Sequence, residues 1–181
     1  VSGVFAPIGT YGSGNGPLGT MSFTAVEGIA FQPGTGMLFA VHRRGGNDVL
    51  FRVDPATGLR VAGAFGGADY LEIDPSQTTF DTTFDIAFAP TGTLFAITWD
   101  GNAQYKLVTV DIQTGIAPTF GGKLNAAAPH GLTFDLGGGA WVVGSPVTGA
   151  GAFAPVDTLS GAIGTVSPVD NGSGYEAIAF P

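Results

Sequence analysis

Short apolar runs recur along the chain at a constant internal spacing, and this spacing predicts the architecture. Three of the runs end in a phenylalanine, at Phe31, Phe88 and Phe134. An aspartate follows each phenylalanine after 23 positions, and a glycine follows each aspartate after four more, as Asp54 and Gly58 do in the first unit. Units that repeat after 46 to 57 residues, with several short strands in each, indicate a repeat protein built from small β-sheets.

Each unit divides into the same predicted strands. In the first unit an inner strand at 27–31 precedes a turn rich in Pro and Gly, a second strand at 37–41 and a third strand at 49–53. The next turn begins with an aspartate that caps it and ends with a glycine suited to the left-handed conformation. A less regular fourth strand completes the unit. The corresponding strands of the other units are predicted at 84–88, 93–97, 105–110, 130–134, 140–143 and 152–156.

We therefore predict an all-β chain that forms a single β-propeller domain over residues 1–181, with about four blades of four-stranded antiparallel sheet. A single β-sandwich is the alternative, but it gives no reason for an offset that repeats three times. The predicted blade units are 25–67, 84–122 and 129–168, with a closing blade made of 175–181 and 1–24.

The closing blade would join the two ends of the chain. Its inner strand is a fourth copy of the apolar run at 176–180, and its outer strands are predicted at 3–10 and 18–24. Pairing both ends within one blade leaves no unpaired inner edge. Alternatively, the open ends pair with other copies of the chain and form a larger ring or a polymer.

The pattern Gly-Ile-Ala-Phe-x-Pro followed by Thr-Gly-x-Leu-Phe-Ala, present at 28–40, resembles propeller blades of the NHL and gluconolactonase-like kind. The resemblance extends over about residues 23–181 and concerns the fold. It implies a secreted, periplasmic or cell-surface protein of the bacterial type. Gluconolactonase-like enzymes use a fuller set of Glu, Asn and Asp ligands than this chain offers, so the resemblance does not extend to their activity.

Composition narrows the function. The net charge of −8 and a pI near 4.3 argue against nucleic acid and against docking on anionic lipid, both of which require basic surfaces. The absence of cysteine excludes disulfides and thiolate metal sites. Neither histidine lies in a nucleophile motif, and we predict no catalytic residue. A mean hydropathy of +0.32 is high for a monomer and predicts that part of the surface is an interface.

One candidate site surrounds the mouth of the propeller's central channel. The residues that open the inner strands are Glu27, Phe84, His130 and Glu176, and Asp85 lies next to them in the sequence. Two carboxylates and an imidazole would bind calcium or another divalent cation there. Alternatively, these side chains only solvate the rim of the channel. An acidic insertion at 67–84 is a second calcium candidate, although it lacks an EF-hand pattern and also suits a solvated loop.

Two loops on the same face are candidate contacts for a ligand or partner. His42, Arg43 and Arg44 form the basic cluster of the chain and would clamp a carboxylate or the acidic patch of a partner, or else neutralise the acidic insertion. Trp99 beside Asp100 suits sugar stacking or a protein contact, unless the indole packs inward between blades.

The third unit carries very little charge, because Asp157 is the one ionisable residue between Asp135 and Asp170. Residues 136–156 are therefore a candidate interface with other protein subunits. We predict a non-catalytic, secreted or periplasmic module for protein binding or assembly. The alternatives are a metal-dependent hydrolase or lyase with its site at the channel mouth, and a carbohydrate-binding propeller.

Overall fold

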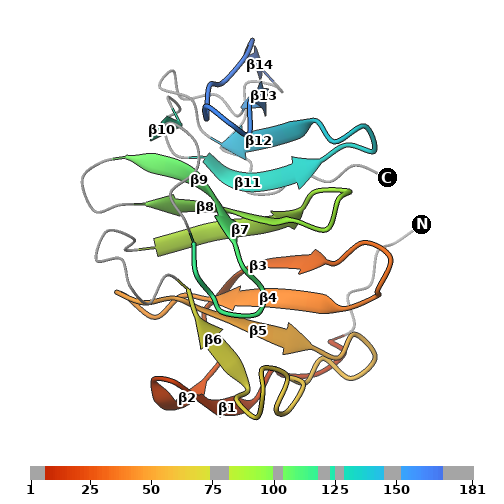
Figure 1. Ribbon diagram of the computed structural model, residues 1–181, viewed down its shortest axis with the longest axis vertical. Helices are drawn as coiled ribbons and strands as arrows, with labels where there is room; N and C mark the ends of the chain where they lie inside the picture. The colour runs from red at the N-terminus through yellow and green to blue at the C-terminus, as the bar shows by residue number, and fades with distance from the viewer. Residues whose placement is uncertain are drawn as a thin grey trace.

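The computed structural model confirms the all-β propeller architecture (Figure 1). The structure describes residues 7–73, 82–99, 104–117, 123–124, 129–144 and 152–168. These residues form three four-stranded antiparallel sheets, called blades 1 to 3 below, and one two-stranded hairpin. The described residues form strands and turns without a helix, so they contain no helix with the length and apolarity needed to cross a membrane.

Each blade consists of four consecutive strands, and the first strand in the chain is the inner one. Blade 1 contains β3 (Val26–Phe31), β4 (Leu38–His42), β5 (Val49–Val53) and β6 (Tyr70–Glu72). Blade 2 contains β7 (Thr82–Phe88), β8 (Leu94–Trp99), β9 (Tyr105–Val110) and β10 (Lys123–Leu124). Blade 3 contains β11 (Pro129–Phe134), β12 (Ala140–Gly144), β13 (Ala152–Val156) and β14 (Ser167–Pro168). The ends of the predicted inner, second and third strands differ from these by at most two residues.

Aspartate and glycine form the turn after the third strand of each blade, as predicted. In blade 1 the Asp54 carboxylate accepts the backbone N–H of Ala56 at 2.9 Å, and Gly58 has a φ of 72°. The same arrangement occurs at the other two turns, where Gly115 and Gly161 have φ values of 77° and 70°. Backbone N–H groups donating to the caps lower the pKa values of all three carboxyls, Asp54, Asp111 and Asp157.

The hydrophobic core lies between blades, with the inner strands β3, β7 and β11 side by side (Figure 1). Blades 1 and 2 meet where Phe39 packs on Phe88, with ring centroids 5.4 Å apart. Blades 2 and 3 repeat this contact between Phe95 and Phe134, at 5.1 Å. The same two positions of the repeat therefore build both blade interfaces.

The N-terminal segment differs from the prediction. Residues 7–10 are exposed and form no strand, and β2 (Gly19–Ser22) pairs with β1 (Ser13–Gly16) as a hairpin. A third apolar cluster holds the segment against blade 1, where Phe23 stacks on Phe51 with centroids 4.2 Å apart. Residues 1–6 and 169–181 lie outside the described residues, so the closing blade stays a prediction.

Three aspartates, called the aspartate clamps, each accept backbone N–H groups and join successive units. Asp69 joins the hairpin to blade 1, because it accepts the N–H of Asn15 at 2.7 Å and of Gly63 at 2.8 Å. Asp48 joins blade 1 to blade 2 through the N–H of Thr83. The third clamp, Asp85, joins blades 2 and 3 and is described with the site below.

Candidate functional site

A β-bulge opens the inner strand of every blade and determines which side chains line the site. The strand registers of β3, β7 and β11 against their neighbours each skip one residue, and these residues are Glu27, Phe84 and His130. An extra residue in a strand changes the direction in which its side chain points. All three bulged residues line one pocket, the inner-strand pocket, together with Arg43. The structure thus brings the residues that open the inner strands of the three described blades to one place.

The inner-strand pocket has a volume of about 210 Å³ and combines an ion pair with two rings. Nε of Arg43 lies 3.2 Å from Oε1 of Glu27. His130 contacts Phe84 edge to face, with ring centroids 5.1 Å apart. The pocket therefore presents a guanidinium, a carboxylate and an imidazole beside an apolar wall. Two sites that the sequence suggested separately, the channel mouth and the basic loop, meet here.

Aromatic rings continue from the inner-strand pocket into blade 2. Phe84 lies 5.4 Å from Tyr105, and Tyr105 lies 4.8 Å from Trp99. Trp99 is half-buried by this packing and stands opposite Thr82 at the end of β8. Asp100, its predicted companion, lies outside the described residues. Trp99 is thus the outer end of a row of four rings that begins at His130.

His42 does not share the surface of the basic cluster. It is buried at the end of β4, where its Nδ1 accepts the N–H of Ala25 at 3.1 Å and its ring meets Phe23 edge to face at 5.8 Å. Burial lowers the pKa of His42. Its assignment as a ligand contact is therefore corrected to a core role, because β4 continues one residue further than predicted. Arg43 and Arg44 follow it and are exposed.

Asp85 connects blades and is turned into the structure. Its two carboxylate oxygens accept the N–H of Ile86 and the N–H of Leu132, each at 2.8 Å. Burial raises the pKa of Asp85 to about 7, against the opposing effect of these two N–H donors. Gly28 of blade 1 approaches from the other side, where a Cβ would stand 2.5 Å from Oδ1. This carboxyl thus lies among the inner strands of all three blades.

The metal prediction rested on Glu27, His130, Glu176 and Asp85. Within the described residues no three His, Asp or Glu side chains are grouped as a metal site. Glu27 is paired with Arg43, and Asp85 holds two backbone N–H groups. Glu176 lies outside the described residues, so the four-residue set stays a prediction.

The acidic insertion and the third blade also have partial outcomes. Asp69 of the insertion is a clamp that pairs with Arg60 at 2.9 Å, and residues 74–81 lie outside the described part of the chain.

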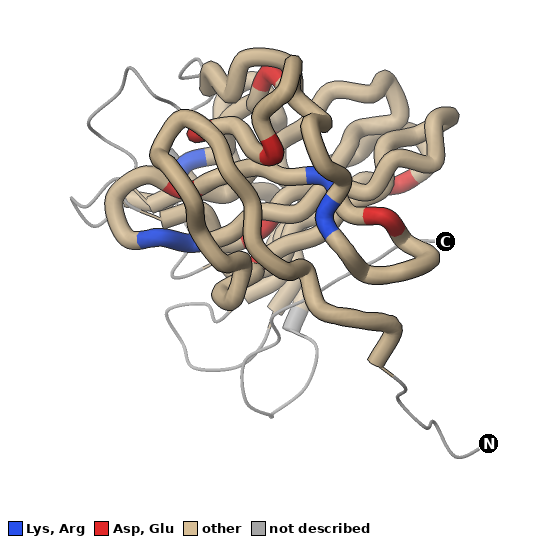
Figure 2. The backbone as a smooth tube through the Cα atoms, turned by 90° about the horizontal axis from the view of Figure 1, so that it is seen from below, with Lys and Arg blue, Asp and Glu red and all other residues tan. Residues whose placement is uncertain are grey.

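In the candidate interface 136–156, Leu136 is 86% exposed, and Trp141 and Phe153 are half-buried with ring centroids 5.8 Å apart. Charges are sparse along the described chain (Figure 2). The interface itself stays a prediction.

Sequence reasoning missed the clamp roles of Asp48 and Asp69 and the bulges. Nothing in the local pattern of Asp48 distinguishes a loop aspartate from one that reaches a neighbouring blade. The bulges had a weak signal in the sequence, since the residue before Gly28 and the residue before Gly131 each break the alternation of apolar and polar positions.

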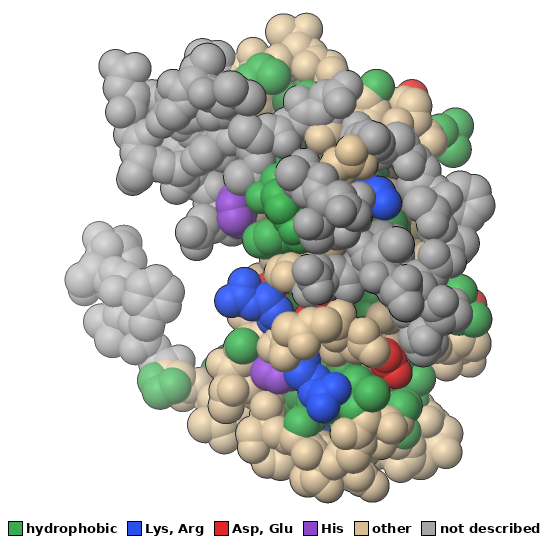
Figure 3. Space-filling model, turned by 90° about the vertical axis from the view of Figure 1, so that its left-hand side faces the viewer, with side chains coloured by type: hydrophobic (Ala, Val, Ile, Leu, Met, Phe, Trp, Pro, Cys, Tyr) green, Lys and Arg blue, Asp and Glu red, His purple; other side chains and the backbone are tan. Residues whose placement is uncertain are grey.

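On the face in Figure 3, basic and histidine side chains lie close to apolar ones, as expected for the inner-strand pocket.

Comparisons with known proteins agree with the fold. No protein-family model and no curated protein matches the chain. It is similar to a putative 6-phosphogluconolactonase from Bacteroides fragilis, at 16% identity and a TM-score of 0.50, over 87% of this chain and 44% of that one. It is also similar to a GH43 glycoside hydrolase with an engineered active site, at 12% identity and a TM-score of 0.50, over 85% of this chain and 32% of that one.

A third similar structure is the Dos1 propeller, at 15% identity and a TM-score of 0.49, over 87% of this chain and 40% of that one. The chain therefore spans less than half the length of each of these three structures. At such identities the likeness concerns the fold alone.

Proposed function

We propose that the chain is a non-catalytic, secreted or periplasmic propeller module that binds an acidic side chain of a partner protein in the inner-strand pocket. The observation that carries this proposal is the meeting of Arg43, Glu27, Phe84 and His130 in one pocket. The bulges that direct three of these side chains recur at the same position of each blade. Repeated bulges of this kind are frequent at functional rims of β-structures.

The donors of the pocket suit a carboxylate. A guanidinium has five N–H donors, and the contact with Glu27 uses Nε. A carboxylate placed between Arg43 and His130 would receive charge-assisted hydrogen bonds from both. The edge of Phe84 would contact the methylene groups of an Asp or Glu side chain. Glu27 holds the guanidinium in place. Its carboxylate also repels anions, so an anion binds only where hydrogen bonds from both Arg43 and His130 outweigh this repulsion.

The size of the pocket favours a single side chain over a free small molecule. Its volume is about 210 Å³, whereas pockets for small-molecule ligands usually hold about 300–1,000 Å³. A side chain presented by a protein surface needs less enclosure, because the surrounding contacts contribute the rest of the binding free energy. This difference supports a protein-binding role over a carbohydrate-binding or hydrolytic one.

A peptide array with acidic, neutral and basic sequences tests the proposal. We expect the wild-type chain to bind acidic peptides preferentially, with a signal that falls as salt is added. Arg43→Gln should abolish the preference. Arg44→Gln is the matched control, because it removes a neighbouring exposed positive charge. The contact of Arg44 with Asp48 is made by its backbone N–H, which the substitution leaves in place. Equal binding to all three classes, or equal loss in both variants, would overturn the proposal.

A further inference from the structure

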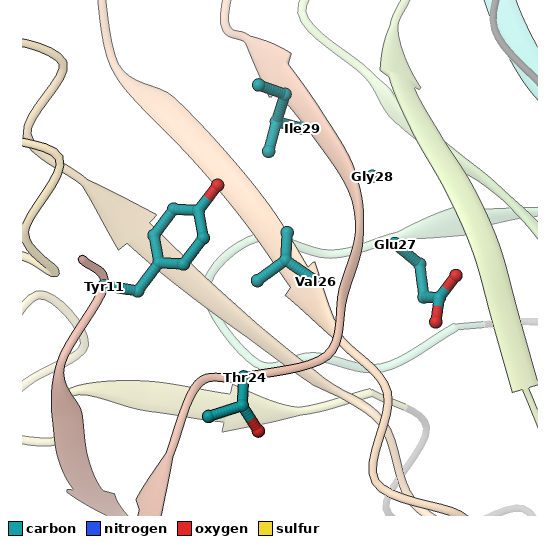
Figure 4. Close-up of a pocket in the computed structure, with 6 residues that line it drawn as sticks. All are labelled: Tyr11, Thr24, Val26, Glu27, Gly28 and Ile29. Carbon is teal, nitrogen blue, oxygen red and sulfur yellow. The ribbon is translucent and has the colours of Figure 1, made fainter. Parts of the chain in front are cut away.

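Two hollows of blade 1 differ in whether they contain a charged group without a partner. The first hollow lies beside β3, where Figure 4 shows Tyr11 and Ile29 around it, with the carboxylate of Glu27 turned away toward the neighbouring strand. That carboxylate is paired with Arg43. The second hollow, called the inter-blade cleft, lies where blade 1 meets blade 2 and contains Arg52.

The inter-blade cleft has a volume of about 380 Å³, and its walls include the side chains of Met37, Phe39, Arg52, Phe65 and Ile112. Phe39 comes from β4, and Arg52 stands opposite it in β5. Ile112 comes from the turn after β9, so blades 1 and 2 both build the cleft. The cleft lies at the opposite end of the strands from the inner-strand pocket.

The guanidinium of Arg52 lacks a partner among the described residues. Its Nε is enclosed and has no hydrogen-bond partner, and neither ion pair of the described chain includes Arg52. The carboxylate of Asp111, which precedes Ile112, caps its own turn and accepts the N–H of Gln113 at 2.7 Å. An enclosed polar group without a partner destabilises the folded chain, and a charged one does so more strongly. A bound anion would supply the missing contact.

The other blades fill the position of Arg52 with neutral residues. Arg52 stands opposite Phe39 in blade 1, and Thr109 stands opposite the equivalent Phe95 in blade 2. In blade 3 the equivalent residue is Pro155. The repeat therefore forms this part of its sheet twice without a guanidinium, so the architecture does not require one in blade 1.

A matching cleft between blades 2 and 3 shows what the repeat builds without this arginine. Phe95 and Thr158 line it at the positions that Phe39 and Ile112 hold in the inter-blade cleft. Its volume is about 290 Å³, and none of the described residues that line it is charged. The two clefts thus share their place in the repeat and differ in the positive charge.

We infer that the inter-blade cleft binds a small organic anion that joins one carboxylate to an apolar body such as an aromatic ring. The carboxylate would accept two N–H groups of Arg52, in the bidentate geometry that a guanidinium favours. The apolar body would lie on Phe65 and Ile112, which pack on the core between blades 1 and 2. The size of the cleft agrees, because sites for small molecules usually hold about 300–1,000 Å³.

The charge of the cleft favours a carboxylate over a phosphate. Arg52 is the one charged residue among the described residues that line it, so it balances one negative charge. A phosphate group carries a charge of about −1.5 to −2 and three acceptor oxygens. Apolar walls would leave some of these oxygens without donors. The cleft is separate from Arg43, so this inference goes beyond the proposed binding of an acidic partner.

Isothermal titration calorimetry with phenylacetate as the probe tests the inference. We expect the wild-type chain to bind phenylacetate roughly tenfold or more tightly than phenylacetamide, which has the same ring without the charge. Acetate has the charge without the ring and should also bind more weakly than phenylacetate. Binding of phenylacetate that is absent, or no tighter than that of either analogue, would overturn the inference.

Substitutions at position 52 locate the site. Arg52→Thr introduces the residue of blade 2, and Arg52→Met retains a long unbranched side chain without the charge. Both variants should lose roughly tenfold or more in affinity for phenylacetate. Thr109→Ser, at the equivalent position of blade 2, is the matched control and should bind as wild type does. Undiminished binding by either variant, once thermal unfolding shows that it is folded, would overturn the inference.

Two further measurements separate this inference from the proposed function. Arg43→Gln should retain the affinity for phenylacetate, because it alters only the inner-strand pocket at the other end of the strands. Arg52→Met should retain the preference for acidic peptides. If Arg43→Gln loses phenylacetate binding and Arg52→Met retains it, the probe occupies the inner-strand pocket and the inference is wrong.

Discussion

The inner strands of blades 1 and 2 contain the same tripeptide, Ile-Ala-Phe, yet they lie in different environments. In β7 the pair Ile86 and Phe88 is 2% and 8% exposed. In β3 the equivalent Ile29 and Phe31 are more than half exposed. Within its sheet, each of the two strands pairs with the second strand of its own blade. The strands differ in their packing, because a preceding blade packs on β7.

The comparison separates what the repeat determines from what its neighbours determine. Strand formation, the bulge and the following turn recur in both blades, so they follow from the local sequence. Burial follows from stacking, because each repeat covers only the next one. An identical tripeptide therefore contributes to the core in blade 2 and to an open surface in blade 1.

Truncating the two isoleucines should give the largest difference. We expect Ile86→Ala to lower the free energy of unfolding by about 2–5 kcal/mol, because it leaves a cavity between blades 1 and 2. Ile29→Ala is the matched control and should cost about 0.5 kcal/mol or less at low protein concentration. Chemical denaturation of both variants measures their free energies of unfolding. Similar losses at the two positions would show that β3 is covered within one chain.

Replacing the clamp of β7 should have the next largest effect. Asp85→Asn leaves one of the two N–H groups, that of Ile86 or that of Leu132, without an acceptor, and we expect a loss of about 1–3 kcal/mol. Denaturant unfolding at pH 8 measures it. Asp54→Asn is a useful control, since that carboxylate caps an exposed turn within a single blade.

The pH dependence of the same variant sharpens this test. The pKa of Asp85 is raised to about 7 in the folded chain, so between about pH 4 and pH 7 the folded state holds a proton that the unfolded state has lost. The proton that Asp85 holds only in the folded state stabilises that state. This stabilisation is fully present near pH 4 and is lost as the pH rises to 7. The stability of wild type relative to Asp85→Asn should therefore fall by about 1 kcal/mol or more over that range and be constant above it. A constant difference throughout would contradict the burial of Asp85.

Gly28 tests how closely β3 approaches β7. A Cβ at this position would meet Oδ1 of Asp85 at 2.5 Å and the backbone nitrogen of Ile86 at 2.9 Å. We expect Gly28→Ala to cost about 1–3 kcal/mol, because the backbone contact cannot be relieved by rotating a side chain. Thermal unfolding measures it, with Ile29→Ala as the neighbouring control. A neutral Gly28→Ala would mean that the inner strands of blades 1 and 2 lie further apart.

The ion pair at the start of β3 should have the smallest effect on stability. Glu27 and Arg43 are 28% and 46% exposed, and exposed pairs contribute about 0–1 kcal/mol. Glu27→Gln should therefore leave the melting temperature almost unchanged while it strengthens the binding of acidic peptides. A large loss of stability would instead assign the pair a structural role.

Much of the fold was predictable because the repeat carries local information. The strand ends and the Asp-to-Gly turns follow from alternation and turn chemistry, and Gly58, Gly115 and Gly161 all adopt the expected positive φ. His42 shows where local information ends. All five residues of β4 are buried, so the alternation that would mark its last residue as part of the strand is absent.

The site was predictable in part for the same reason. The convergence of Glu27, Phe84 and His130 follows from their equal positions in the repeat. The pairing of Glu27 with Arg43 and the clamp role of Asp85 depend on distances between elements that are remote in the sequence. The covering of one blade by another is likewise a tertiary property, which explains why the N-terminal hairpin was predicted in a different arrangement.

The alkylation rate of a single cysteine at position 31 or 88 tests most directly whether β3 has an open face. With Phe31→Cys in dilute solution, we expect labelling at nearly the rate of the unfolded chain, because Phe31 is exposed on β3. With Phe88→Cys, we expect slow labelling at every concentration, because that position lies between two blades of the same chain. Equally slow labelling at both positions in dilute solution would contradict the account.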